Sequence, residues 1–283
     1  MLSSLSTLVT EVPLTAEFGL LQLLPWTYWV GLSLMGLPVF LALRGGRSGL
    51  FVATGALFFA VLAGTPALFE PNPSIWDAYV HLAEAQNIGL NGRLPGDLLA
   101  YSANWPGFFL TVWMSSAAMG GAALELLVLF PFLTSALTFL ALFVFLRSLF
   151  GPTTAAIGSL LGSLLNVWAQ FHLSPQSLGL FLALLVLATV WRRKTPLRIT
   201  ASLLFVGLVV SHPTSTILIL GILVLDVALR SALRLVRSTK RSSVEQEKGF
   251  AYSPALPYGV AWVAWLFFLA IGSSQTAETV ILA

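Results

Sequence analysis

Three side chains capable of acid–base chemistry share one short segment. Asp77, His81 and Glu84 stand at spacing i, i+4, i+7, which places them on one face of a helix. A carboxylate and an imidazole one turn apart can share a proton, bind a divalent cation or hold a sugar hydroxyl. Residues 74–77 also fit an S-x-x-D capping box, in which Asp77 only satisfies the start of the helix. The spacing alone leaves both interpretations open.

A second histidine stands between two apolar runs. His172 belongs to residues 170–176, in which Ser174 and Pro175 have the pattern of an N-cap and a first-turn proline. This pattern predicts a turn followed by a new helix. His172 either contacts a ligand near the membrane surface or extends its ring to the interface, as amphipathic side chains do. Both interpretations stay open.

The third histidine lies in a polar patch, residues 211–215, that interrupts a long apolar stretch. Pro213 breaks the apolar run and separates two helices within this patch, because proline disrupts the hydrogen bonds of a helix interior. Polar residues among apolar ones are costly unless they face water, protein or a cavity. We interpret Ser211 and Thr214 as capping residues of a turn, and His212 as a candidate ligand contact.

The composition excludes the water-soluble classes of protein. Only 9% of the 283 residues are charged and 57% are hydrophobic, whereas soluble domains average about 25% charged residues. The basic residues occur in short clusters between apolar runs, so they indicate membrane topology rather than a nucleic-acid partner. The chain has no cysteine, which excludes disulfides, thiolate metal sites and a cysteine nucleophile.

The segments that must position these residues are apolar runs. A membrane-spanning helix needs about 17–25 mostly apolar residues. The candidate spans are 26–43, 50–69, 124–147, 152–170, 176–191, 198–214, 216–232 and 256–272. Residues 106–119 form a further apolar run that is too short to span. The sequence therefore predicts an all-α, polytopic transmembrane helical bundle of about eight spans plus one short interfacial or re-entrant helix, in a single domain over residues 1–283.

The distribution of charge assigns the connections to the two sides of the membrane. Lys and Arg gather on the cytoplasmic side. If the N-terminus is outside and residues 106–119 do not cross, thirteen of the fourteen basic residues are cytoplasmic and Arg93 is the exception. Seven of the eleven acidic residues and the three histidines then lie outside. We expect a multi-pass protein of the cell membrane with an extracytoplasmic N-terminus and outward-facing chemistry.

Two long polar segments connect the spans. Residues 70–105 have a helical pattern, then a turn-rich middle, then an aromatic end typical of a membrane interface. We predict an external loop with interfacial helices there. Residues 238–248 are charged and lack apolar periodicity, which predicts a cytoplasmic linker.

Two stretches of the chain resemble the GT-C superfamily of polyprenyl-phosphate-sugar-dependent glycosyltransferases. They are residues 75–82, IWDAYVHL, and residues 101–110, YSANWPGFFL, which follow a glycine-rich turn. In such proteins an aspartate in the first large external loop precedes a juxtamembrane helix, and the next span ends in a basic-aromatic-Gly turn. Residues 106–119 resemble that helix and residues 145–151, FLRSLFG, resemble that turn. The resemblance covers about residues 50–230.

The resemblance implies a glycosyltransferase that moves a sugar from a polyprenyl-phosphate carrier to an acceptor at the extracytoplasmic face. Asp77 would be the catalytic residue, either the base that activates the acceptor or the group that orients a metal or the acceptor. His81 and His212 would contact the donor phosphate, and the external Arg93 would be a further phosphate partner. The candidate substrate-binding residues are His81, Glu84, Arg93, His172 and His212. Membrane lipids and the lipid-phosphate sugar are the expected partners.

The chain departs from the family pattern in two ways. Ile75 and Tyr79 stand two positions from Asp77, where many members have a paired acid, so the involvement of a divalent cation stays open. The chain also has fewer helices than typical members and lacks their soluble extracytoplasmic domain. We therefore interpret it as a partial or truncated member.

Two other functions stay open beside the enzyme. If the chain is a polytopic transporter or a lipid-handling protein, we expect charged residues within the spans. Asp226, one turn before Arg230, is the one acidic residue inside a predicted span that fits this expectation. A non-catalytic membrane subunit that binds a membrane protein partner predicts that Asp77 can change without effect.

Overall fold

The computed structural model describes residues 20–69, 75–97, 100–121, 123–166, 171–192, 195–238 and 254–270. The regular structure of these residues is entirely helical. The helices are α1 (Leu20–Leu23), α2 (Trp26–Arg44), α3 (Ser48–Phe69), α4 (Trp76–Asn91), α5 (Tyr101–Asn104), α6 (Pro106–Ala118), α7 (Ala123–Leu149), α8 (Pro152–Leu164), α9 (Pro175–Trp191), α10 (Thr195–Ser211), α11 (Pro213–Ser238) and α12 (Ala255–Phe268). The all-α prediction is confirmed.

Eight of these helices correspond to the eight apolar runs of the sequence. Four of them, α2, α3, α7 and α11, are long and apolar enough to cross a membrane, and α9, α10 and α12 are shorter apolar helices. In the run 152–170 the helix α8 ends at Leu164, and residues 167–170 lie outside the described residues. The 13 residues of α8 rise about 20 Å, less than the roughly 30 Å of a bilayer core. The prediction that this run is one long spanning helix is therefore wrong.

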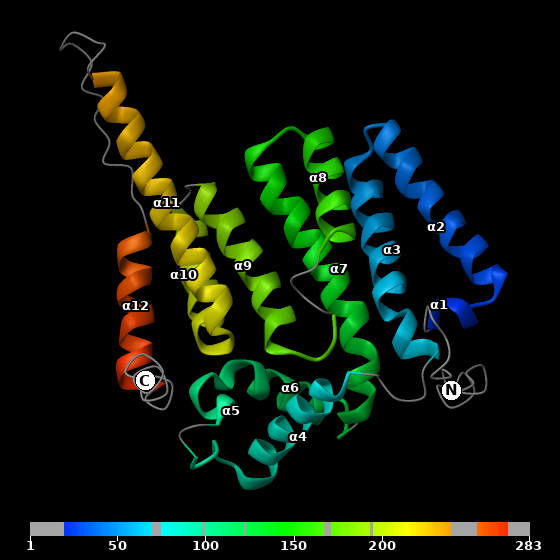
Figure 1. The fold of residues 1–283 in the computed structure, drawn as a ribbon, viewed down its shortest axis with the longest axis horizontal. Helices are drawn as coiled ribbons and strands as arrows, with labels where there is room; N and C mark the ends of the chain where they lie inside the picture. The colour runs from blue at the N-terminus through cyan, green and yellow to red at the C-terminus, as the bar shows by residue number, and fades with distance from the viewer. Residues whose placement is uncertain are drawn as a thin grey trace.

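The helices form an upright bundle with a second layer across one end (Figure 1). α2, α3 and α7 to α12 run side by side, whereas α4, α5 and α6 lie across the end of the bundle, and we call these three helices the end layer. α6 contacts α4, α7, α9 and α10, so it packs inside the molecule without running along it. This arrangement agrees with the prediction of a short helix that does not cross.

The basic connections lie at the end of the bundle opposite the end layer (Figure 1). The turns α2–α3 and α7–α8 and the connection α9–α10 all reach that end, and they carry Arg44, Arg47, Arg147 and Arg192. The grouping of basic segments expected from the charge pattern is thus present in the structure. Of the predicted linker 238–248, Ser238 ends α11 and residues 239–248 lie outside the described residues.

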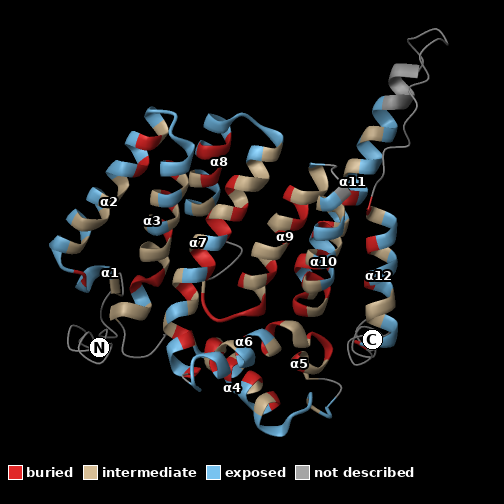
Figure 2. Ribbon diagram, turned by 180° about the vertical axis from the view of Figure 1, so that it is seen from behind, coloured by how far each residue is buried: buried red, intermediate tan, exposed pale blue. Residues whose placement is uncertain are grey.

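Large apolar side chains are exposed along the outer helices. Leu34 on α2, Leu203 on α10 and Val260 on α12 are each more than 60% exposed, and Figure 2 shows exposed residues along the length of α2, α11 and α12. An apolar surface of this extent is unfavourable in water and suits lipid. The structure therefore has the features of a membrane protein.

Glycines permit the closest helix contacts in the bundle. A Cβ atom on Gly55 or Gly64 of α3 would collide with the rings of Phe139 and Phe132 of α7. Small residues that let helices approach closely are the usual device of membrane helix packing. The α3–α7 pair forms one wall of the bundle, and α7 also contacts α4 and α6 of the end layer.

Candidate functional site

Asp77 lies between two histidines that come from different parts of the chain. Its Oδ2 atom is 3.2 Å from Nε2 of His81, one turn along α4, and 3.5 Å from Nε2 of His172. The Asp77 side chain is 43% exposed, while those of His81 and His172 are 15% and 10% exposed. A half-exposed carboxylate held by two largely buried imidazoles can accept a proton from a molecule arriving from solvent.

The start of α4 directs Asp77 towards this pair. α4 begins at Trp76, and its N-cap is Ile75, which has no capping side chain. The capping-box interpretation required the helix to start three residues before Asp77, at Ser74, which lies outside the described residues. With Ile75 as the N-cap, Asp77 is in the first turn, where a negative charge is favourable beside the helix dipole, and its carboxylate is available to the histidines.

A capped turn before α9 holds His172 in place. The Ser174 hydroxyl accepts the backbone N–H of Ser177, and Pro175 occupies the first helical position. These observations confirm the predicted cap and first-turn proline. The Ser177 hydroxyl in turn donates to the backbone carbonyl of His172 (3.2 Å). The bundle therefore fixes His172, and α4 of the end layer brings Asp77 to it.

A pocket opens beside the Asp77–His81–His172 cluster. Its volume is about 270 Å³, and it lies between α3, α4, α7 and the segment before α9. The lining residues are Leu62, Ala63, Pro66, Ala67, Ile75, Ala78, Leu127, Pro131, Phe171 and His172. Ile75 and Ala78 flank Asp77 in sequence, and His172 belongs to both the pocket and the cluster. The pocket can therefore bring an apolar ligand to the edge of the cluster.

Burial keeps the His172 ring neutral. It lowers the pKa of His172 below the ordinary value, and the nearby Asp77 carboxylate opposes the shift only in part. The 3.5 Å separation from Asp77 is long for a hydrogen bond, and neither ring nitrogen of His172 has a hydrogen-bond partner among the described residues. Such a buried unsatisfied nitrogen costs about 1–3 kcal/mol, so His172 has hydrogen-bonding capacity that a ligand or ordered water would use.

Glu84 lies further along α4, beside Tyr101 of α5. Burial raises the pKa of the Tyr101 hydroxyl, and the negative charge of Glu84 raises it further. The Oε2 atom of Glu84 is buried and has no hydrogen-bond partner in the part of the chain that the structure describes. Asp77, His81 and Glu84 all lie on α4, so their i, i+4, i+7 spacing places them on one face of that helix, as predicted.

Arg93 is not part of the cluster. It follows Gly92, the left-handed C-cap of α4, whereas Asp77 lies in the first turn of that helix. The rise of 1.5 Å per residue separates the two ends by about 20 Å. Arg93 is exposed, so it is available to solvent at the far end of the end layer.

His212 lies in the turn between α10 and α11 and caps α11. Its Nδ1 atom accepts the backbone N–H of Ser215 (3.2 Å) and lies 2.8 Å from the Ser215 hydroxyl. Among the described residues, no hydrogen bond or ion pair joins it to Asp77. The polar patch 211–215 thus forms the predicted turn, in which the histidine itself is the cap.

We expect the capping role of His212 to make the protein acid-sensitive. Burial lowers the pKa of His212 to about 4, while the unfolded chain takes up the proton near pH 6.5. The folded state therefore loses stability as the pH falls from 6.5 towards 4, by at most about 3 kcal/mol. Thermal unfolding in detergent between pH 7.5 and 4.5 measures this loss. In the variant His212→Asn, which keeps a capping side chain but does not titrate, the loss should be clearly smaller; an unchanged pH dependence would contradict the assignment.

The donor atoms of the cluster do not surround a common centre. The described residues include no group of three or more His, Cys, Asp or Glu side chains arranged to hold a metal ion. Both Nε2 atoms instead face the same oxygen of Asp77. The arrangement fits a carboxylate that has two imidazole neighbours. These residues do not provide a ligand set for the divalent cation that the sequence analysis left open.

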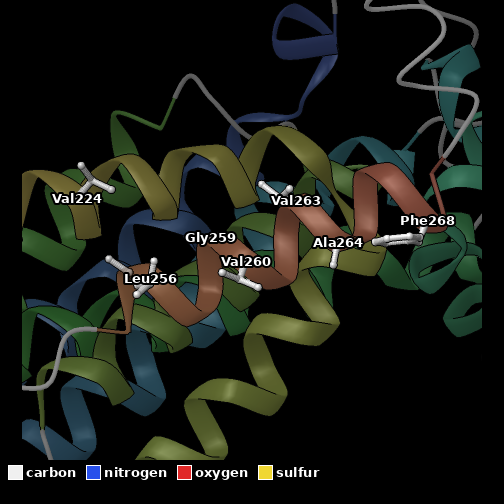
Figure 3. Close-up of a pocket in the computed structure, with 8 residues that line it drawn as sticks. Val224, Leu256, Gly259, Val260, Val263, Ala264 and Phe268 are labelled. Atoms are coloured by element: carbon white, nitrogen blue, oxygen red, sulfur yellow. The ribbon is translucent and has the colours of Figure 1, made fainter.

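A larger groove on the outer side of α11 and α12 is purely apolar (Figure 3). Its volume is about 620 Å³, and its lining residues are Val224, Ala255, Leu256, Gly259, Val260, Val263, Ala264 and Phe268. The groove has no titratable or nucleophilic side chain. It suits hydrocarbon and offers no catalytic chemistry.

The sequence interpretation missed Tyr101 and Trp105 as site residues. They were included in an aromatic segment assigned to the membrane interface. In the structure Tyr101 contacts Trp105 (ring centroids 5.1 Å apart) and Phe109 (6.0 Å), and Phe109 contacts His81 (5.7 Å). The spacing of Tyr101, Trp105 and Phe109, one every four residues, was the available signal that these rings share a face.

No protein-family model matches the chain, and neither a curated protein nor a solved structure matches it.

Proposed function

We propose that this protein is a membrane glycosyltransferase-like enzyme. It transfers a sugar from a polyprenyl-phosphate carrier to an acceptor hydroxyl at the extracytoplasmic face, and Asp77 is its base. The observation that carries the proposal is the half-exposed Asp77 carboxylate, which lies between two histidines at the edge of an apolar pocket next to the end layer. An enzyme acting on a lipid-linked sugar needs this combination, because its substrate has an apolar chain and its chemistry needs water-accessible polar groups.

The proposed reaction is a displacement at the sugar. The acceptor oxygen attacks the anomeric carbon, its proton passes to Oδ2 of Asp77, and the bond from the anomeric carbon to the phosphate oxygen breaks. The electron pair of that bond leaves with the polyprenyl phosphate. His81, with the proton on Nε2, holds the carboxylate towards the acceptor, and His172 lies on its other side. A base positioned in this way contributes about 10²–10⁴-fold to a rate.

The distribution of charge in the bundle supports the proposal that Asp77 faces the outside of the cell. The connections α2–α3, α7–α8 and α9–α10 carry arginines at one end, and positive connections remain in the cytoplasm. The end layer and Asp77 are then extracytoplasmic, and so is the N-terminal side of α2. This orientation places the acceptor outside the cell, where the sugar of a flipped lipid carrier is available.

Cysteine labelling tests the orientation, because the native chain has no cysteine. Gln86 on α4 and Thr153 on α8 are both exposed and lie at opposite ends of the molecule. We expect a membrane-impermeant maleimide to label Gln86→Cys in intact cells and Thr153→Cys only after permeabilisation. Labelling of both variants from the same side would contradict the proposed topology.

A transfer assay tests the activity. The purified protein is reconstituted in liposomes with a radiolabelled polyprenyl-phosphate sugar, and the release of free polyprenyl phosphate is measured with and without a lipid extract as the source of acceptors. We expect release that depends on both the protein and the extract. If no sugar-bearing carrier among glucosyl, mannosyl, galactosyl and N-acetylglucosaminyl forms is consumed, the chain is better explained as a non-catalytic subunit.

A further inference from the structure

Three buried polar atoms on α4 and just after α5 have no hydrogen-bond partner in the described part of the chain. The Oε2 atom of Glu84, the Nδ1 atom of His81 and the Nε1 atom of Trp105 are buried and have no hydrogen-bond partner within the described ranges. Trp105 as a whole is only 9% exposed. Buried polar groups of native proteins are nearly always satisfied, so an unsatisfied group calls for a specific explanation, such as a bound water or a ligand.

Ring contacts of Tyr101 link two of these residues, Trp105 and His81. The Tyr101 ring lies 5.1 Å from that of Trp105 and 6.0 Å from that of Phe109. Its hydroxyl is close enough to the Glu84 carboxylate for that charge to raise its pKa. Phe109 also contacts the His81 ring, at 5.7 Å. The unsatisfied donor on Trp105 is therefore next to Tyr101, and the chain of ring contacts ends at His81. Glu84, which carries the unsatisfied acceptor, lies one turn after His81 on the same face of α4.

The chemistry of this group matches a ring that carries several hydroxyls. A carboxylate accepts hydrogen bonds from hydroxyl groups, an indole N–H donates one, and a neutral imidazole nitrogen accepts or donates according to its tautomer. Aromatic rings provide flat apolar surfaces with a polar edge, which suit the C–H face of a pyranose. The group includes no cation, so it does not suit a phosphate.

We infer that Glu84, Tyr101 and Trp105 form a sugar-binding subsite next to the base Asp77. This inference rests on the proposed function for the identity of the ligand, since the sugar is the one transferred. The subsite takes the hydroxyls of the sugar between α4 and α5, while the apolar pocket on the other side of Asp77 is left for the lipid chain.

A binding experiment without turnover tests the subsite. The full-length protein in nanodiscs is titrated with glucosyl-, mannosyl-, galactosyl- and N-acetylglucosaminyl-phosphoryl polyprenols, and with polyprenyl phosphate that has no sugar. We expect at least one sugar-bearing lipid to bind about tenfold or more tightly than bare polyprenyl phosphate. In Glu84→Gln and Trp105→Phe this advantage should fall to less than threefold, while the affinity for bare polyprenyl phosphate stays the same.

Two comparisons separate the subsite from the activity. Asp77→Asn should keep the binding advantage of the sugar, so a protein without transferase activity can still show the subsite. Glu125→Gln removes a carboxylate from the exposed first turn of α7 and serves as the matched control with unchanged binding. If none of the four sugars improves binding in the wild type, or if Glu84→Gln retains the full advantage, the subsite is overturned and ordered water accounts for the unsatisfied atoms.

Discussion

Replacing Asp77 by asparagine is expected to lower the rate of sugar transfer at least 100-fold. Asparagine has nearly the same size and still offers an oxygen to His81 and His172, but it cannot take up the proton of the acceptor. A positioned base contributes about 10²–10⁴-fold, so its loss should dominate the kinetics. The measurement is the initial rate of polyprenyl phosphate release in liposomes, at saturating donor, for the variant and the wild type.

A second carboxylate of the chain provides the matched control for this variant. Glu125→Gln makes the same kind of change on an exposed carboxylate of α7 and should leave the rate within twofold of wild type. The Asp77 side chain is 43% exposed, so the loss of its ion pair with His81 should change stability by no more than about 1 kcal/mol. Both variants should therefore unfold at similar temperatures. Equal transfer rates for Asp77→Asn and wild type would remove Asp77 from the mechanism and favour a scaffolding role.

Adding one methyl group at Gly55 is expected to destabilise the bundle by about 1–3 kcal/mol. In Gly55→Ala the new Cβ atom would lie 2.6 Å from Cε1 of Phe139. Phe139 is completely buried, and its ring stacks on Phe59 with centroids 5.0 Å apart. It therefore has no free space to move into, and α3 and α7 must separate.

The matched control for that variant is Gly36→Ala in α2. A Cβ atom on Gly36 meets nothing within 4 Å, and alanine favours a helix by up to about 1 kcal/mol over glycine. Thermal unfolding of the two variants and the wild type in one detergent decides the matter. We expect Gly55→Ala to unfold at a lower temperature and Gly36→Ala at the same or a higher one; the reverse order would show that α3 and α7 do not pack as described.

Hydropathy was enough to predict most helices of the bundle. Their bounds differ from the predicted runs by a few residues, because lipid-facing helices are apolar throughout their length and end at polar or glycine turns. The exception is α8, which ends at Leu164 although the apolar Leu165 follows; residues 167–170 lie outside the described residues. The hydropathy of a segment measures how unfavourable its exposure to water is. It does not show whether an apolar segment is helical, so it cannot locate the end of a helix within an apolar run.

The candidate site was predictable only where it is local in sequence. The i, i+4 spacing is sufficient to bring Asp77 and His81 together on α4. The approach of His172 joins residues 95 positions apart, and no periodicity can encode it. It depends on how the end layer sits on the bundle, which is a property of tertiary packing. The separation of Asp77 from Arg93, in contrast, could have been inferred, since a helix of that length keeps its two ends apart.

The end layer is inserted between two helices that are already in contact. α3 and α7 pack directly against each other through Gly55 and Gly64, and the chain leaves and rejoins this pair at the same end of the bundle (Figure 1). Lengthening, shortening or exchanging the segment between them therefore changes neither the direction of any later helix nor the wall on which the segment rests. A fold connected in this way can change the surface that its end layer presents while the helices of the bundle stay as they are.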